Sequence, residues 1–196
     1  MLFASNTSSL RVTEIGREMP EGSKGKGRFG GLHFLDALIS PVVEIARAEW
    51  TTEETVAALK GFAVDIGKRP ILCKDIEGFI ANRLQMPMLM EALKMVDAGE
   101  ATFEDIDAAM CLGYRHPLGP FQLLDFIGLD LIQTVIGSWR ATRSSSSSAS
   151  SSTNETSSHR RSSPTLDRLV AEGRLGRKTG RGFYDYSGSG DKKSSK

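Results

Sequence analysis

The chain has little of several features that would assign it to a class at once. Only two of its 196 residues are cysteines, Cys73 and Cys111, so the sequence predicts neither a disulfide framework nor a cysteine-based metal site. No apolar run approaches the roughly 20 residues that a membrane-spanning helix needs. The net charge is +1, so no overall field favours nucleic acid or an anionic membrane. We therefore expect no metal, no nucleic-acid partner and no membrane partner.

The two ends of the chain show no targeting signal. The start, MLFASNTSSL, lacks the basic region and long apolar segment of a secretory signal, and it lacks the Arg-rich pattern of a transit peptide. The last residues, DKKSSK, differ from a peroxisomal signal. With so few cysteines, the simple expectation is a soluble protein of a reducing intracellular compartment, either the mitochondrial matrix or the cytoplasm.

The first portion, residues 1–77, is α/β in character. The short apolar runs LFAS, GLHFL and VVEIA suit buried strands, and RPILCKD suits a further strand. Apolar residues recur at helical spacing between residues 51 and 67. Thr51 and Glu54 have the spacing of a capping box, and Gly67 supplies the stop. Residues 17–28, rich in Gly and Lys, predict a surface loop.

The second portion, residues 78–190, has a helical pattern. Apolar spacing with Gly and Pro punctuation predicts helices over residues 82–98, 102–113, 120–139 and 163–173. Gly128 and Gly137 weigh against one unbroken rod in the third of these. Residues 144–163 are dominated by serine and cannot bury enough apolar area to offset their ordering entropy, which predicts a disordered insertion.

One tempting motif is rejected. Gly25, Gly27 and Gly30 spell a literal G-x-G-x-x-G, which binds a dinucleotide only when it follows a strand and opens a helix. Here the preceding residues, REMPEGSK, are not a strand, and the following GLHFL is a strand rather than a helix start. We interpret the segment as a flexible loop.

Four polar positions lie where a purely structural role is hard to justify. The run from Asn6 to Ser9 directly follows the strand LFAS, at the carboxyl end where open α/β sheets bind ligands. His33 and Glu44 lie inside apolar strands, and Asn82 follows GFIA where the pattern turns helical. A lone strand histidine is more often a satisfied core residue, but an unpaired buried carboxylate costs several kcal/mol. Glu44 therefore needs a partner, and His33 is the economical one: a carboxylate that orients an imidazole is general-base architecture.

At this point the sequence resembles a known family. NTSSL, GLHF, VVEI, CKDxxGFIxNR, GxxxPLGPFxLLDxIGLD and GRKTGRGFYDY occur in the order found in the L-3-hydroxyacyl-CoA dehydrogenases, and the likeness covers nearly the whole chain except the serine insertion. The ending TGRGFYDY is similar to that of the single-function enzymes related to 3-hydroxybutyryl-CoA dehydrogenase. The family oxidises the 3-hydroxyl of an acyl-CoA thioester to a ketone and passes hydride to NAD, in fatty-acid or butanoate metabolism.

The resemblance implies a role for each matched residue. His33 resembles the family's general base and Glu44 its orienting carboxylate. Ser8 and Asn82 resemble the pair that donates hydrogen bonds to the substrate. Lys178, in GRKTG, resembles a lysine that reaches the NAD site from the C-terminal segment.

Two further residues are assigned to the NAD site by the resemblance and by position. Asn6 stands at the carboxyl end of the first strand. Asp36 replaces a family amide near NAD, because this chain continues HF with Leu35-Asp36-Ala37 where the family has Phe-Asn-Pro. A negative charge there is expected to weaken nucleotide binding. The segment between His33 and Glu44 is also one residue shorter than usual, which could shift the register of Glu44.

The resemblance implies an architecture with one part absent. We expect the α/β remnant of a Rossmann-type NAD-binding domain, truncated at its N-terminal side and without the glycine-rich first half, followed by an all-α C-terminal dimerisation domain. Leu124, Phe126, Ile127 and their neighbours could form the interface of a homodimer. Because nothing here supplies the glycine backbone that holds a pyrophosphate, we expect the chain to be inactive alone.

Two alternatives stay open. The chain could be a non-catalytic dimerisation module, or a structural relative like the crystallins recruited from this family. It could also belong to a related dehydrogenase acting on a free 3-hydroxy acid or a sugar acid.

Overall fold

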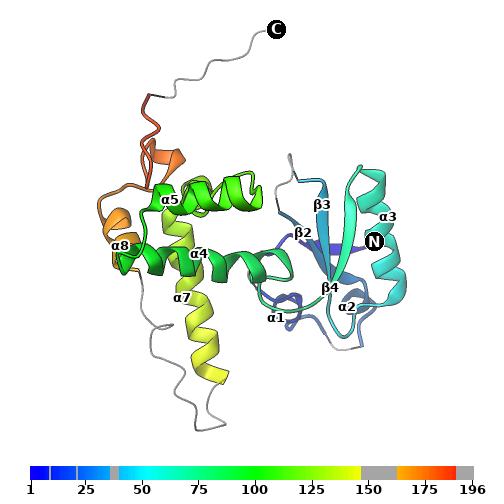
Figure 1. Cartoon of the computed structure of the whole chain (residues 1–196). Helices are drawn as coiled ribbons and strands as arrows, with labels where there is room; N and C mark the ends of the chain where they lie inside the picture. The colour runs from blue at the N-terminus through cyan, green and yellow to red at the C-terminus, as the bar shows by residue number, and fades with distance from the viewer. Residues whose placement is uncertain (9, 21, 36–39, 147–162, 189–196) are drawn as a thin grey trace. The chain divides into compact units, whose positions relative to one another are not determined.

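The computed structural model describes residues 1–8, 10–20, 22–35, 40–146 and 163–188 (Figure 1). The chain forms two compact units, Met1–Met86 and Pro87–Lys196, which divide inside a helix that contains Pro87. The domain boundary predicted at residues 77–78 stays a prediction. The serine-rich insertion predicted at residues 144–163 falls largely outside the described residues, which end at Ser146 in a helix and resume at Ser163.

A mixed sheet of four strands forms the centre of the described part of the first unit. Its strands are β1 (Phe3–Ser5), β2 (Phe29–Phe34), β3 (Val42–Arg47) and β4 (Arg69–Lys74), side by side in this order. β1 runs parallel to β2, β2 antiparallel to β3, and β3 parallel to β4. The four strands predicted from the sequence are therefore confirmed, although β1, which was predicted to be buried, is largely exposed.

Alternation along β2 and β3 separates two kinds of side chain. Successive residues of a strand point to opposite faces of the sheet. On one face, Leu32, Val43 and Ile45 pack with helix α3 (Glu53–Asp65), which lies along the sheet in Figure 1. His33 and Glu44 alternate with these apolar residues and so belong to the opposite face.

The opposite face is covered by short elements. Val12, from the single helical turn α1 (Val12–Ile15), packs with Phe29, Ala46 and Phe79 in a second apolar cluster. Val12 and Ala46 are fully buried. Phe79 of this cluster packs against the His33 ring, so the cluster lies beside the polar residues of that face.

The start of α3 differs by one residue from the predicted capping box. Thr52, not Thr51, caps the helix, and its Oγ1 accepts a hydrogen bond from Thr55 N at 3.3 Å. Thr51 is buried instead, where its hydroxyl donates to the Phe29 carbonyl at 2.8 Å and accepts from Ala48 N. Two adjacent threonines offered the same local signal, and tertiary packing decided between them.

The rejected glycine motif lies in a tightly packed segment rather than a flexible loop. Lys24–Gly27 forms one helical turn, α2, and Gly30 lies inside β2. A Cβ on Gly30 would come within 2.9 Å of Leu59, and one on Gly27 within 2.9 Å of Thr52. These two glycines thus allow segments of the same chain to pack closely. No helix follows Gly30, so the segment lacks the arrangement of a dinucleotide-binding loop, as expected. The prediction that the segment is a flexible loop was wrong.

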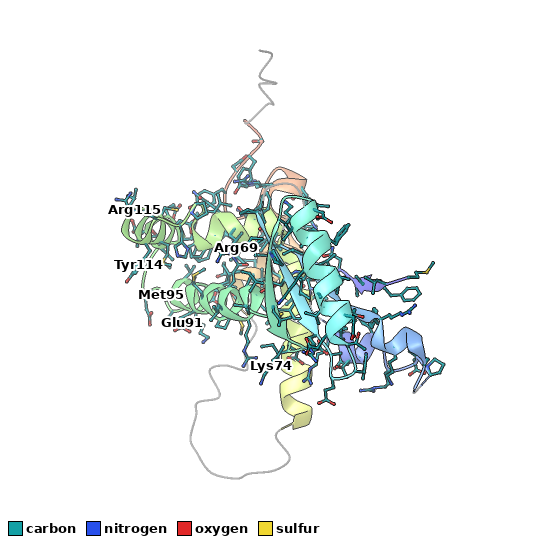
Figure 2. The ribbon with its side chains drawn as sticks, turned by 90° about the vertical axis from the view of Figure 1, so that its right-hand side faces the viewer. Arg69, Lys74, Glu91, Met95, Tyr114 and Arg115 are labelled. Atoms are coloured by element: carbon teal, nitrogen blue, oxygen red, sulfur yellow. The ribbon has the colours of Figure 1, made fainter. Side chains whose placement is uncertain are left out.

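The second unit is built of helices. α4 (Ala81–Asp97) enters it from the first unit, and α5 (Phe103–Ala108), the π-helix η1 (Ala109–Gly113), α6 (Pro120–Ile127), α7 (Leu129–Ser146), α8 (Pro164–Ala171) and the short helix η3 (Arg177–Thr179) follow. Thr102 and Ser163 cap α5 and α8, as their positions in the sequence suggest. Figure 2 labels Glu91 and Met95 on α4 and Tyr114 and Arg115 just beyond η1. Tyr114 is 77% exposed.

Gly128 divides the third predicted helix into α6 and α7. Its φ of +105° is accessible to glycine and strained for other residues. The two helices bend by 94° at this point, and although the pair together is long and apolar enough to span a bilayer, no single helix in the described ranges is. Leu124, assigned above to a subunit interface, is fully buried within the unit, whereas Phe126 is about half exposed. Leu124 is therefore a core residue.

Two buried aspartates hold the C-terminal segment onto these helices. Asp125 of α6 accepts hydrogen bonds from Phe183 N and Tyr184 N, both at 2.9 Å, and from the Tyr186 hydroxyl at 3.1 Å. Asp107 of α5 accepts from the Tyr184 hydroxyl at 2.9 Å and from two backbone N–H groups at the start of α6. Burial raises the pKa of Asp125, although its bonds from backbone N–H groups oppose that shift.

Candidate active site

The centre of the site is a buried, hydrogen-bonded histidine–glutamate pair between neighbouring strands. His33 of β2 and Glu44 of β3 are direct partners in the antiparallel register, so their side chains rise from the same face. His33 Nδ1 lies 2.7 Å from Glu44 Oε2. His33 is 3% exposed and Glu44 is 2% exposed. The shorter segment between the two residues has not shifted Glu44 out of register with His33.

The second oxygen of Glu44 is held by the start of α4. Oε1 accepts hydrogen bonds from Ile80 N at 3.0 Å and from Ala81 N at 2.9 Å. An ionised carboxylate can only accept hydrogen bonds, so beside an ionised Glu44 the donor in their bond is Nδ1 of His33. The neutral imidazole then keeps its lone pair on Nε2, which is the atom that can take a proton.

Asn82 and Ser8 meet beside this pair. Asn82 Nδ2 donates to the backbone carbonyl of Ser8 at 3.3 Å, and Asn82 immediately follows Ala81, whose N–H binds Glu44. Ser8 is exposed and Asn82 is half-buried. This hydrogen bond joins the two residues predicted to bind substrate, from segments far apart in the sequence, and Asn82 directly follows an amide that binds Glu44.

Asn6 lies at the other end of the same loop. Its Oδ1 accepts a hydrogen bond from Phe34 N at 2.9 Å, and Phe34 directly follows His33. Thr7 closes the loop, because its Oγ1 bonds both Leu10 N and Leu10 O. The carboxyl ends of β1 and β2 and the start of α4 thus converge on one site in the first unit.

Asp75 binds the helical turn α1, which follows this loop, and was not singled out from the sequence. Its two carboxylate oxygens accept from Val12 N and Thr13 N, both at 2.7 Å, so it caps α1 from a distant position. The only sequence signal was its place in CKDxxGFIxNR, between a strand and a helix. The contribution of the backbone amides of Ile80 and Ala81 could not be predicted from the sequence, because nearly every residue type has a backbone N–H group.

Comparison with known proteins matches two successive parts of the chain to one family. Residues 1–76 match the family model described as 3-hydroxyacyl-CoA dehydrogenase, NAD binding domain, and residues 78–186 match 3-hydroxyacyl-CoA dehydrogenase, C-terminal domain. The chain belongs to the 3-hydroxyacyl-CoA dehydrogenase family. A mixed sheet followed by helices fits the Rossmann-type NAD-binding domain and helical C-terminal domain of such a dehydrogenase.

Several relatives of this dehydrogenase family member share its sequence closely. It is 41% identical to human mitochondrial hydroxyacyl-coenzyme A dehydrogenase over 94% of this chain and 54% of the relative. It is 37% identical to the 3-hydroxybutyryl-CoA dehydrogenase of Mycobacterium tuberculosis, over 94% of this chain and 60% of that protein. The chain thus spans about half the length of the curated relatives it matches.

A solved structure gives the same likeness in three dimensions. The (S)-3-hydroxybutyryl-CoA dehydrogenase PaaH1 from Ralstonia eutropha superposes with a TM-score of 0.80 at 35% identity, covering 95% of this chain and 60% of that one.

The remaining predicted site residues of this dehydrogenase family member are Asp36 and Lys178. Asp36 falls in the 36–39 gap of the structure. Lys178 lies in η3 of the second unit, where its ammonium pairs with Asp130 and lies close to Gly128. The hydrogen bond from Lys178 holds the pKa of Asp130 below its usual value. Across the described ranges, no group of three or more His, Cys, Asp or Glu side chains could hold a metal ion.

Proposed function

We propose that this protein carries the catalytic residues for NAD-dependent oxidation of an L-3-hydroxyacyl-CoA to the 3-oxoacyl-CoA, in fatty-acid or butanoate metabolism. The single observation that supports this most is the buried His33–Glu44 pair, closed on the carboxylate side by two backbone amides. Membership of the dehydrogenase family gives the reaction class. The names of the relatives give the substrate class.

In this proposal His33 is the general base. Nε2 takes the proton of the substrate's 3-hydroxyl as the C3–H bond breaks, and bound NAD supplies the hydride acceptor. Glu44 keeps Nε2 in its unprotonated form before the reaction and stabilises the imidazolium afterwards. A low-dielectric setting strengthens this attraction, because both side chains are almost fully buried.

Ser8 and Asn82 position the substrate. Each carries a polar group at the border of the His33–Glu44 pair, and their mutual hydrogen bond fixes the Ser8 loop against α4. Hydrogen bonds to the 3-oxygen and the thioester carbonyl of an acyl-CoA would hold C3 and its hydroxyl in line with Nε2. Such positioning supplies a large part of the rate in two-substrate reactions.

The first unit corresponds, in this proposal, to the C-terminal part of a Rossmann-type domain. Asn6, at the carboxyl end of β1, would contact NAD, and the family resemblance adds Lys178 of the second unit and Asp36, which lies outside the described residues. Among the described residues, no loop with the G-x-G-x-x-G spacing joins a strand to a helix N-terminus where a pyrophosphate could bind.

The second unit is proposed as the dimerisation module. Phe126 and Leu131 are about half exposed near the α6–α7 corner, and such apolar side chains are common in subunit contacts. We propose a homodimer formed through this helical unit.

Turnover by a chimera tests the proposed function. The residues that precede the matched region in the human mitochondrial relative are joined to Met1, and oxidation of NADH by acetoacetyl-CoA is followed at 340 nm. We expect turnover in the chimera and none in the chain alone. His33→Ala should lower kcat by about 10²-fold or more, as loss of a general base does.

His116→Ala is the matched control, because His116 lies in the second unit and is partly exposed. Near-normal turnover of the His33→Ala chimera would remove His33 from the mechanism. A folded chimera that binds NADH but reduces a free 3-oxo acid in preference to acetoacetyl-CoA would move the substrate assignment to free acids.

A further inference from the structure

Phe79 adopts a backbone conformation that a bulky residue rarely takes. Its φ is +48°, and the preceding Gly78 has a φ of +71°, so two consecutive residues are left-handed. A non-glycine residue in this region is strained, and such strain persists only where the surroundings over-determine it. Two backbone hydrogen bonds hold this conformation: Phe79 N donates to the Ile76 carbonyl, and Arg83 N donates to the Gly78 carbonyl.

The left-handed turn determines where the next two amides point. Ile80 N and Ala81 N follow Phe79 directly and both donate to Glu44 Oε1. If residue 79 returned to ordinary helical geometry, the chain would enter α4 at a different angle and these two N–H groups would leave the carboxylate. The strain at Phe79 is thus coupled to the orientation of Glu44.

The side chain of Phe79 contacts the other member of the pair. Its ring centroid lies 5.4 Å from that of the His33 imidazole, with the planes inclined by 50°. Phe79 is 1% exposed and belongs to the apolar cluster on that face of the sheet. An imidazole packed against a fixed ring loses the freedom to rotate away from its carboxylate.

We propose that Phe79 is a positioning residue for the general base: its backbone aims two amides at Glu44, and its ring holds the His33 imidazole with Nδ1 toward Glu44. This proposal rests on the proposed function for its catalytic meaning. Its structural content is the tautomer of His33, which can be measured in the chain without substrate or NAD.

The test uses ¹⁵N-histidine-labelled full-length chain and long-range ¹H–¹⁵N correlation spectra at a pH where the imidazoles are neutral. The chain has three histidines, so His33 can be assigned from a His33→Gln variant. We expect the unmodified chain to show mainly the Nδ1–H tautomer at His33. In Phe79→Leu and Phe79→Met, which keep an apolar side chain but remove the ring, the ratio of Nδ1–H to Nε2–H should fall by roughly two- to tenfold.

Phe121→Leu is the matched control, because Phe121 is an equally buried phenylalanine in the second unit. A general loss of packing would move both variants alike, whereas the proposal expects the tautomer ratio to stay unchanged in Phe121→Leu. A folded Phe79→Leu or Phe79→Met protein with the tautomer ratio of the unmodified chain would overturn the proposal.

The unmodified chain supplies a further readout in case both variants unfold. Ring protons of Phe79 should show nuclear Overhauser contacts to the His33 imidazole, and their absence would overturn the proposal. Failure of the chimera to turn over with an intact tautomer would instead count against the proposed function alone.

Discussion

Replacing Glu44 by glutamine changes one carboxylate oxygen into an NH₂ group and leaves the size of the side chain unchanged. The amide oxygen can still accept from Ile80 N and Ala81 N, which lie 3.0 and 2.9 Å from Oε1 in the native protein. The NH₂ group then faces His33 Nδ1, and two donors cannot share a hydrogen bond. The imidazole is therefore expected to adopt the opposite tautomer, with its proton on Nε2.

The change in the free energy of unfolding follows from the hydrogen bonds that each Glu44 variant keeps and loses. Glu44→Gln retains the two backbone bonds and loses one charge-assisted bond at 2.7 Å, so the free energy of unfolding should fall by about 1–3 kcal/mol. Glu44→Ala strands three buried donors and should cost about 3–5 kcal/mol. Turnover of the Glu44→Gln chimera should fall by about 10²- to 10⁴-fold, because Nε2 no longer offers a lone pair to the substrate hydroxyl.

Two measurements check this reasoning together. Imidazole ¹⁵N shifts report the tautomer of His33, and initial rates with acetoacetyl-CoA and NADH report kcat. A Glu44→Gln protein that keeps the Nδ1–H tautomer would refute the hydrogen-bond assignment. A protein with the inverted tautomer and full kcat would show that Nε2 of His33 is not the base.

Three further expectations concern stability. Gly182→Ala would place a Cβ 1.9 Å from Asp125 Oδ1 and should lower the free energy of unfolding in urea by about 1–3 kcal/mol or more. Gly61→Ala, inside α3 with nothing within 4 Å of the added Cβ, should raise it by about 0.5–1 kcal/mol. Equal effects of the two substitutions would contradict the close approach of Gly182 to Asp125. Asp75→Asn should lower the free energy of unfolding by about 1–2 kcal/mol, because an amide offers one acceptor oxygen to two backbone N–H groups; an unchanged urea midpoint would dismiss this cap. Burial, with a smaller effect of two nearby carboxylates, raises the pKa of Cys73 from 9.0 to about 12. The contribution of its neutral thiol to the free energy of unfolding is therefore complete below pH 9 and is lost as the pH rises toward 12. Cys73→Ala should flatten the decline in unfolding free energy across that window, and identical alkaline slopes in both proteins would argue against a buried neutral thiol.

Much of the fold could be predicted from the sequence because local signals agreed with the tertiary structure. Alternating and continuous apolar runs located all four strands of the described sheet. Gly128 marked the corner between α6 and α7, because a positive φ costs glycine little. The capping residue of α3 was predicted one position early, because Thr51 and Thr52 are equally good caps locally and a contact with Phe29 decides between them.

The candidate site could be predicted only in part. An unpartnered carboxylate inside an apolar strand demands a partner, which led from Glu44 to His33. The contributions of Ile80, Ala81 and Phe79 could not be found in this way, since they depend on backbone direction and on a left-handed residue with no sequence signature. Leu124 was assigned to a surface because apolar periodicity does not distinguish a core helix face from an interface.

Asp107 and Asp125, which bind the C-terminal segment, also affect the order in which the helices of the second unit and that segment can pack. Asp107 is translated 77 residues before Tyr184, its hydroxyl donor, and Asp125 is translated 58 residues before Phe183. During synthesis Asp107 can already bind the two backbone N–H groups at the start of α6, whereas Asp125 lacks its donors from Phe183, Tyr184 and Tyr186 until these last aromatic residues have emerged. A nonsense codon or frameshift between α8 and Phe183 would therefore leave a nearly full-length product in which Asp125 has lost all three of these hydrogen bonds.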